Sequence, residues 1–195
     1  MKTSLFLIVI LFLFNTRKST ETKKNKEDLN GRWSVVTEKS EINFKITVMY
    51  LFPVSGSFSK VRGTIDIRHD LLEADADLVI DPASIDTGNE KRDAHLKSKD
   101  FFYVNQFPEI RFVSSEIEQA DPGRSYTVTG DLTIKDVTKS VNVPVTLEGI
   151  NDQGEIVFTG SKNINRRDYN IDYSGRGLSD TAELEFTIVG KRDRE

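Results

Sequence analysis

Residues 126–148 read YTVTGDLTIKDVTKSVNVPVTLE, and this stretch decides the fold class. Apolar or small side chains stand at every second position of residues 126–134 and again of residues 141–147, and polar side chains or Pro144 stand between them. A strand with this alternation has one dry face and one wet face. Such strands are typical of antiparallel sheets, because strands of parallel sheets are apolar on both faces. The stretch therefore predicts two long strands of an all-β, antiparallel domain.

The same alternation recurs through most of the chain after Trp33. It is found at residues 42–48, 63–68, 74–80 and 181–188, and shorter runs occur at 33–37, 110–117 and 155–160. Together these segments predict about eight or nine strands. Strands with one apolar face must close on that face as a sandwich or a barrel, and the alternation does not separate the two. Pro144 lacks a ladder donor, so we expect a sheet edge or a bulge at that position.

One segment breaks the β pattern. Residues 81–89 read DPASIDTGN, which is turn chemistry, and Asn89 is a candidate helix N-cap. Leu96, Phe101 and Phe102 give residues 90–104 an apolar side. We predict a short helical insertion at about residues 89–104, packed on or into the opening of the β-structure.

The N-terminus has the pattern of a targeting segment. Residues 5–14 are ten consecutive apolar residues, which is too short for a membrane span of ~20 residues and fits a secretory signal peptide. No A-x-A-like cleavage site follows, and the next residues are basic. We therefore predict that residues 1–20 are a signal peptide or an uncleaved membrane anchor, that residues 21–31 are a polar linker, and that residues 32–191 form the exported domain.

Composition excludes several classes of function. The 195 residues contain no cysteine, which excludes disulfides, thiolate catalysis and cysteine-based metal sites. Only two histidines are present, so no metal site is predicted. Of the 27 basic and 31 acidic side chains, six and three lie in residues 1–31, which leaves a net charge of −7 on the rest of the chain. That charge lacks the basic footprint of a nucleic-acid binder, so no nucleic-acid partner is expected.

The insertion carries the strongest resemblance to a known family. Residues 84–112 read SIDTGNEKRDAHLKSKDFFYVNQFPEIRF and closely resemble the signature of the YceI-like family of bacterial periplasmic lipid-binding proteins. Further matches are Trp33, Gly56-Ser57-Phe58 with Gly63, Gly130-Asp131-Leu132-Thr133-Ile134 with Val137-Thr138-Lys139, and Arg167-Asp168-Tyr169. The resemblance covers about residues 33–190. One departure is Asn170-Ile171, where the family commonly has Gly.

The resemblance implies a lipocalin-like, eight-stranded antiparallel barrel with short helices near one end. It also implies a periplasmic protein that binds polyisoprenoids, such as quinone side chains, or fatty-acid derivatives. We therefore expect non-enzymatic binding, transport or sequestration of a long apolar ligand, with no cofactor besides that lipid. The alternative is a ligand-free structural or stress-response interaction protein with a filled barrel. The resemblance also allows a homodimer through an exposed edge strand.

The apolar face supplies the candidate ligand-binding residues. Side chains of Phe, Ile, Leu and Val suit a ligand of isoprene or methylene units, and each buried CH₂ contributes ~0.8 kcal/mol. The candidates are Phe44, Ile46, Phe58, Ile65, Leu78, Phe101, Phe102, Phe107, Phe112, Leu132, Ile134, Val143, Val145, Phe158 and Phe186. The alternative is that they simply fill the barrel. Small residues on the same face favour a ligand, because they leave room inside: Gly63, Ala74, Ala76, Gly130 and Ala182.

A second candidate site is the polar cluster of the insertion, made of Asp86, Thr87, Asn89, Arg92, Asp93 and His95. It could bind a ligand head group, or Asp93 and His95 could act as an acid/base pair. We favour a structural role, in which the cluster caps turns and the helix while Arg92 pairs with a carboxylate. No nucleophile motif and no phosphate-binding glycine loop is present, so no catalytic residue is predicted.

A basic patch lies in the same insertion. Lys91, Arg92, Lys97 and Lys99 could make a transient contact with an anionic membrane surface. The simpler interpretation is a solvated helix face.

Overall fold

The computed structural model describes residues 28–194. The strands are β1 Gly31–Val35, β2 Glu41–Val48, β3 Phe52–Phe58, β4 Val61–Ile67, β5 Ala74–Ile80, β6 Ile85–Asp86, β7 Ile110–Gln119, β8 Ser125–Ile134, β9 Val137–Ile150, β10 Glu155–Asn165 and β11 Thr181–Arg192. The α-helix is α1 Glu90–Leu96, and the 3-10 turns are η1 Thr37–Lys39, η2 Leu71–Glu73, η3 Pro82–Ser84, η4 Arg166–Tyr169 and η5 Gly175–Gly177. The predicted signal peptide or anchor at 1–20 lies outside the described residues.

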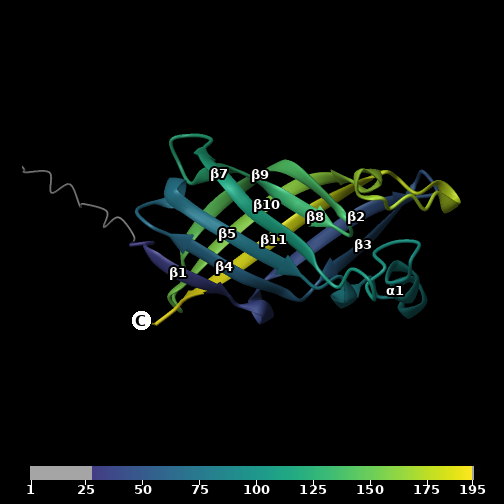
Figure 1. Ribbon diagram of the computed structural model, residues 1–195, viewed down its shortest axis with the longest axis horizontal. Helices are drawn as coiled ribbons and strands as arrows, with labels where there is room; N and C mark the ends of the chain where they lie inside the picture. The colour runs from purple at the N-terminus through teal and green to yellow at the C-terminus, as the bar shows by residue number, and fades with distance from the viewer. Residues whose placement is uncertain (1–27, 195) are drawn as a thin grey trace, which may run out of the picture.

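Eight strands close a barrel (Figure 1). They follow one another in the order β1, β4, β5, β7, β8, β9, β10 and β11, and β11 pairs back with β1. Every pairing in the ring is antiparallel. The predicted all-β, eight-stranded antiparallel barrel is thus confirmed, and the barrel is the closure that alternation alone left open.

Three further strands lengthen the wall at the end of the barrel where α1 lies (Figure 1). β2 pairs with β11 beyond its contact with β1, and β3 and β6 follow at its side. The sequence pattern missed β3, since Pro53, Ser55 and Gly56 give that segment the composition of a turn.

The helical insertion is shorter than the predicted span of residues 89–104. The α-helix ends at Leu96, and turns continue to Gln106; in one of them the Phe102 amide donates to the Leu96 carbonyl oxygen at 3.1 Å. Asn89 is the N-cap, because its side chain accepts from the Arg92 amide at 3.0 Å. This cap confirms the predicted start of the helix.

Buried apolar side chains come from all eight wall strands. Trp33 on β1 is 1% exposed, and its indole Nε1 donates to the Leu29 carbonyl oxygen at 2.9 Å. Val61 and Ile156 are fully buried. Full burial of one such aliphatic side chain contributes roughly 1.5–3 kcal/mol, so this interior is the main source of stability.

Phenylalanine rings lie over three glycines of neighbouring strands. A Cβ built on Gly130 would lie 2.6 Å from Phe112 Cζ, and one built on Gly160 would lie 2.3 Å from Phe186 Cζ. Gly56 is covered by a third phenylalanine ring in the same way. The expectation that Gly130 leaves room for a ligand is therefore wrong, because an aromatic ring fills that space.

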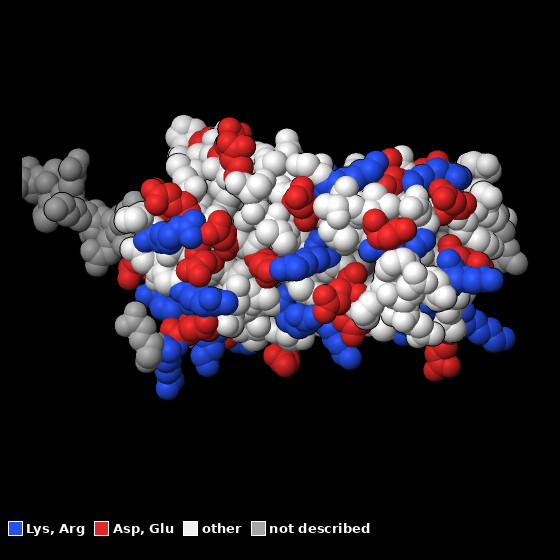
Figure 2. Space-filling view, in the orientation of Figure 1, with Lys and Arg blue, Asp and Glu red and all other residues white. Residues whose placement is uncertain are grey.

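The outer wall carries both signs of charge. On the face drawn in Figure 2, acidic and basic side chains alternate and neither gathers into one field. Cross-strand ion pairs contribute to this pattern, such as Arg111 with Asp77 at 2.5 Å and Arg68 with Asp75 at 2.6 Å. Within residues 28–194, no helix has the length and hydropathy needed to cross a bilayer.

Candidate ligand-binding cavity

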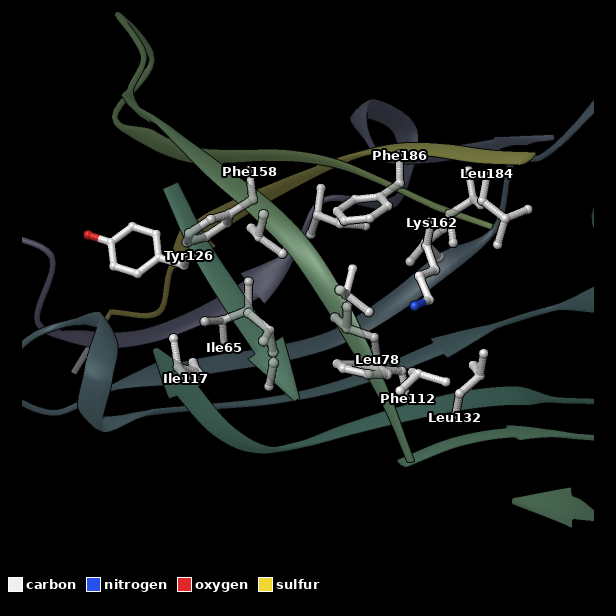
Figure 3. A pocket seen from close by; sticks show the side chains of 18 of the residues that line it. Ile65, Leu78, Phe112, Ile117, Tyr126, Leu132, Phe158, Lys162, Leu184 and Phe186 are labelled. Atoms are coloured by element: carbon white, nitrogen blue, oxygen red, sulfur yellow. The ribbon is translucent and has the colours of Figure 1, made fainter. Parts of the chain in front are cut away.

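The barrel encloses a cavity of about 170 Å³ (Figure 3). Its wall consists of apolar side chains apart from Tyr126 and Lys162. The Tyr126 hydroxyl points away from the other labelled side chains, whereas the Lys162 amine points in among them (Figure 3). The cavity surface itself is therefore hydrocarbon, and Lys162 is the one basic side chain among the residues that form the wall.

Eight of the fifteen candidate ligand-binding residues lie on the wall of this cavity. They are Ile65, Leu78, Phe112, Leu132, Val143, Val145, Phe158 and Phe186. All eight are on strands, where alternation fixed the side of the sheet to which each side chain points. Their role in binding stays a prediction.

The other seven candidates lie away from the cavity wall: Phe44, Ile46, Phe58, Phe101, Phe102, Phe107 and Ile134. Three of them form an aromatic cluster at the α1 end. The ring centroids of Phe44 and Phe58 are 5.6 Å apart, and those of Phe58 and Phe102 are also 5.6 Å apart. Phe101 is 7% exposed and packs against Tyr173, with ring centroids 4.9 Å apart. This cluster packs the insertion against the barrel, as predicted.

Sequence reasoning missed Lys162, although a signal for it was present. The alternating run predicted at residues 155–160 continues as Phe158, Gly160, Lys162 and Ile164. Extending the run to the end of β10 puts Lys162 in the inward phase between small and apolar positions. A lysine was not expected there, because lysine is almost never buried without a partner.

The polar cluster is held together by hydrogen bonds among its own members. The Thr87 hydroxyl donates to Asp93 Oδ1 at 2.5 Å and accepts from Arg92 Nε at 2.7 Å. Arg92 Nη2 also donates to the Thr87 carbonyl oxygen at 2.8 Å. Within residues 28–194, Arg92 thus binds Thr87 and not a carboxylate, so that part of the structural prediction is wrong. The structural role of the cluster as a whole stays a prediction.

The remaining members of the cluster are similarly occupied. Asp86 accepts from the Gly88 amide at 2.7 Å, and His95 Nε2 lies 3.1 Å from Asp100 Oδ2. The side chain of Asp93 contacts Thr87, and no interaction joins Asp93 to His95 among residues 28–194. This geometry does not favour the acid/base pair. Across the same residues, no group of three or more histidine or carboxylate side chains is arranged to hold a metal ion.

A buried arginine at the end of β10 was also missed. Arg166 is 5% exposed, and its guanidinium donates to the carbonyl oxygens of Ser179 at 2.9 Å and of Ile171, and to Asp180 Oδ1 at 2.9 Å. Burial lowers the pKa of Arg166. Because its donors reach across the segment between η4 and β11, Arg166 holds that segment against the barrel.

The ladder between β9 and β10 ends early, and we call the place where it ends the β9–β10 seam. Its last pair is Gly160 with Val145. Beyond it, residues 137–144 pair only with β8 and residues 161–165 pair only with β11. Pro144 adjoins the last pair, which confirms the sheet edge expected at a residue without a donor.

The cavity reaches this seam. Its wall includes Val141 and Val143 on the β9 side, and Lys162 and Ile164 on the β10 side. Lys162 is half-buried and lies two residues beyond the last β9–β10 pair. The one basic residue of the cavity wall is therefore at the part of the wall where β9 and β10 no longer pair.

A closed antiparallel barrel with a short helix at one end and an apolar cavity defines the class of lipocalin-like barrels. A family model described as the YceI-like domain matches residues 33–190. A UPF0312 protein of Yersinia enterocolitica is 33% identical over 200 residues, which cover 98% of this chain and 97% of that protein. Another, from Photorhabdus laumondii, is 33% identical over 170 residues, covering 85% and 88%. The chain belongs to the YceI-like family.

Solved structures share the fold. BcnA of Burkholderia cenocepacia matches with a TM-score of 0.72 and 29% identity over 80% of this chain and 99% of its own. The Campylobacter jejuni YceI protein matches with a TM-score of 0.65 and 29% identity, covering 74% and 88%. A polyisoprenoid binding domain from Saccharophagus degradans matches with a TM-score of 0.66 over 83% and 98%, and at 16% identity that likeness concerns the fold alone.

Proposed function

We propose that the protein binds, carries or sequesters a long apolar molecule in its barrel and has no enzymatic role. The observation that carries this proposal is the cavity wall, which is hydrocarbon except for Tyr126 and Lys162. Such a wall recognises isoprene or methylene chains by burial, at ~0.8 kcal/mol per CH₂. The polyisoprenoid binding named for the Saccharophagus degradans domain supports the same ligand class.

The size of the cavity bears on the ligand. About 170 Å³ is less than the roughly 300–1,000 Å³ of sites for drug-sized molecules. The enclosed space holds a short segment of chain, so a longer chain must displace side chains or extend beyond the enclosed space. The small volume also supports the second candidate function, a ligand-free structural or stress-response protein with a filled barrel.

Extraction of the natively purified protein with solvent, followed by mass spectrometry, separates the two candidates. The carrier predicts a stoichiometric isoprenoid or fatty derivative in the extract. The extracted protein is then titrated with quinones of increasing side-chain length. An empty extract together with no uptake at any length would overturn the carrier and favour the filled barrel.

A matched pair of variants tests the cavity itself. Phe186→Asp places a carboxylate in the apolar wall and is expected to abolish ligand retention, since an unpaired buried charge is strongly unfavourable. Ser161→Asp adds the same charge at an exposed position of β10 and is the control. If Phe186→Asp does not fold, Val143→Asp beside the seam replaces it. A folded variant of either kind that still copurifies with lipid contradicts the cavity assignment.

We further propose that the protein collects its ligand at a membrane, through the turn between β2 and β3. The exposed fractions of the four consecutive residues there are 58% for Met49, 89% for Tyr50, 73% for Leu51 and 55% for Phe52. Exposed apolar residues in one block are typical of protein or membrane contacts. The turn lies at the same end of the barrel as α1 (Figure 1), which carries Lys91 and Arg92 of the basic patch that could contact an anionic membrane.

Cosedimentation with phosphatidylglycerol vesicles tests this contact. The double variant Tyr50→Ser with Leu51→Ser is expected to lose binding. Leu72→Ser, at a residue 48% exposed in the turn between β4 and β5, is the control and should bind like the unmodified protein. Equal sedimentation of all three would contradict the proposal. Export to the periplasm and a homodimer through an edge strand stay predictions.

A further inference from the structure

Lys162 is an unusual residue for its position. It lies on β10 between Gly160 and Ile164 in the phase that faces the cavity, and its amine points inward in Figure 3. Its cross-strand partner on β11 is Leu184, which also lines the cavity. The Lys162 side chain therefore lies beside hydrocarbon, and the residue as a whole is half-buried.

No group of the described chain neutralises it. Among residues 28–194, no carboxylate, carbonyl or hydroxyl oxygen lies within hydrogen-bonding or ion-pairing distance of Lys162. Other lysines do have such partners: Lys39 contacts Glu155 at 2.8 Å, and Lys139 contacts Asp168 at 3.3 Å. A cation that is half removed from water without a partner is unfavourable, and an anion brought by a ligand would relieve that cost.

The position of Lys162 fits the head of an amphiphile. A chain lying among Leu78, Phe112 and Phe158 would be in the apolar part of the cavity. Its polar end could then lie at the β9–β10 seam, where β9 and β10 share no ladder. A lysine ammonium acts as a point charge that binds carboxylate or phosphate equally, without the planar geometry that arginine imposes.

We propose that the ligand is an anionic single-chain amphiphile, whose carboxylate or phosphate pairs with Lys162 Nζ while its chain occupies the cavity. This inference rests on the proposed function and names the ligand class of that same cavity. The alternative source of each head group, a free fatty acid or a phosphorylated long-chain alcohol, is an outcome of the test.

The test uses three probes with the same chain: palmitate, hexadecyl phosphate and hexadecanol. Dissociation constants are measured by adding each probe to the full chain after its bound lipid has been removed. The same measurement is made with Lys162→Met, which keeps the length of the side chain and removes its charge. At least one anion is expected to bind the unmodified protein about 10- to 100-fold more tightly than hexadecanol, the range of a charge-assisted hydrogen bond. Lys162→Met is expected to lose that preference and keep hexadecanol binding.

Two controls keep the result interpretable. Lys45→Met removes an exposed ammonium on β2 and should leave all three constants unchanged. Lys162→Arg keeps the charge and should keep the preference for an anion.

The outcomes separate this inference from the proposed function. Equal binding of all three probes to the unmodified protein would overturn the head-group role while the apolar carrier stands. Binding of none of them would count against the carrier itself. A preference for palmitate alone identifies a carboxylate ligand, and a preference for hexadecyl phosphate alone identifies a phosphate ligand. If Lys162→Met does not fold, Lys162→Gln, which also removes the charge, replaces it in the same comparison, and an anion preference that survives in either folded variant overturns the role of Lys162.

Discussion

Two cations four residues apart, Lys162 on β10 and Arg166 at the start of η4, differ in whether they have partners inside the protein. Arg166 follows Lys162 by four residues, and both are removed from water to different degrees. The Arg166 guanidinium donates to three carbonyl oxygens of the segment between η4 and β11 and to the carboxylate of Asp180. The Lys162 ammonium has no partner among residues 28–194.

The difference separates polar groups whose hydrogen bonds are satisfied within the protein from polar groups that have no partner there. A buried charge with all its donors satisfied stabilises one conformation and has nothing left for a ligand. The polar cluster of the insertion belongs to the first kind, since Thr87 links Arg92 to Asp93. Lys162 belongs to the second kind, and this makes it the better candidate for recognition than the denser cluster.

We expect the largest effect on stability at Arg166, the cation whose donors are satisfied within the protein. Arg166→Met leaves its acceptors without donors in a buried site, and we expect the free energy of unfolding to fall by about 3–5 kcal/mol. Arg167→Met is the control, because Arg167 is exposed and its ion pair with Asp180 should contribute only about 0.2–1 kcal/mol. Urea denaturation followed by circular dichroism measures both. Equal losses for the two variants would remove the contrast with Lys162.

The polar cluster should show the next largest effect. Thr87→Val removes the hydroxyl that joins Arg92 to Asp93, which is expected to cost about 1–3 kcal/mol of stability. Ligand retention should not change, because the cluster lies outside the cavity wall. The same denaturation experiment and lipid extraction check the two expectations. A variant with full stability and lost retention would instead favour a head-group site in the cluster.

Lys162, which has no partner in the described part of the chain, is expected to lower the free energy of unfolding rather than raise it. In protein stripped of lipid, Lys162→Met is expected to leave the free energy of unfolding unchanged or to raise it by about 1 kcal/mol, since an apolar side chain replaces an unpaired charge. Denaturation with and without palmitate measures this. A loss of stability in the stripped protein would mean that Lys162 has an internal partner and belongs with Arg166.

The sequence was most informative where one physical period dominates. Alternation placed residues such as Phe112 and Phe158 on the inner face, and the structure has both on the cavity wall. The same rule has no hold on Phe101 and Phe102, which lie in turns and whose place depends on long-range packing. The position of a phenylalanine within the insertion therefore did not indicate whether it lines the cavity or packs elsewhere.

Contacts between distant segments were the part that could not be predicted. Arg166 reaches Ser179 and Asp180 across a loop, and no local pattern records that. The inward orientation of Lys162 could have been predicted, because Phe158 and Ile164 on β10 have the same phase. Alternation cannot predict that Lys162 has no ion-pair partner among the described residues, because that depends on the side chains of the other strands.

We expect the smallest effect at Glu155, a buried carboxylate that, like Arg166, has partners within the protein. Its hydrogen bond from Asn151 and its contact with Lys39 at 2.8 Å lower the pKa of this carboxyl. A lowered folded-state pKa means that the stabilisation is present above the ordinary glutamate value of about 4.3 and is lost as pH falls through the folded value. We expect the difference in urea midpoint between the unmodified protein and Glu155→Gln to shrink from pH 7 to pH 3. Glu118→Gln, at an exposed position of β7, should show no such change, and a difference for Glu155→Gln that stays constant with pH would mean that its ion pair adds nothing beyond packing.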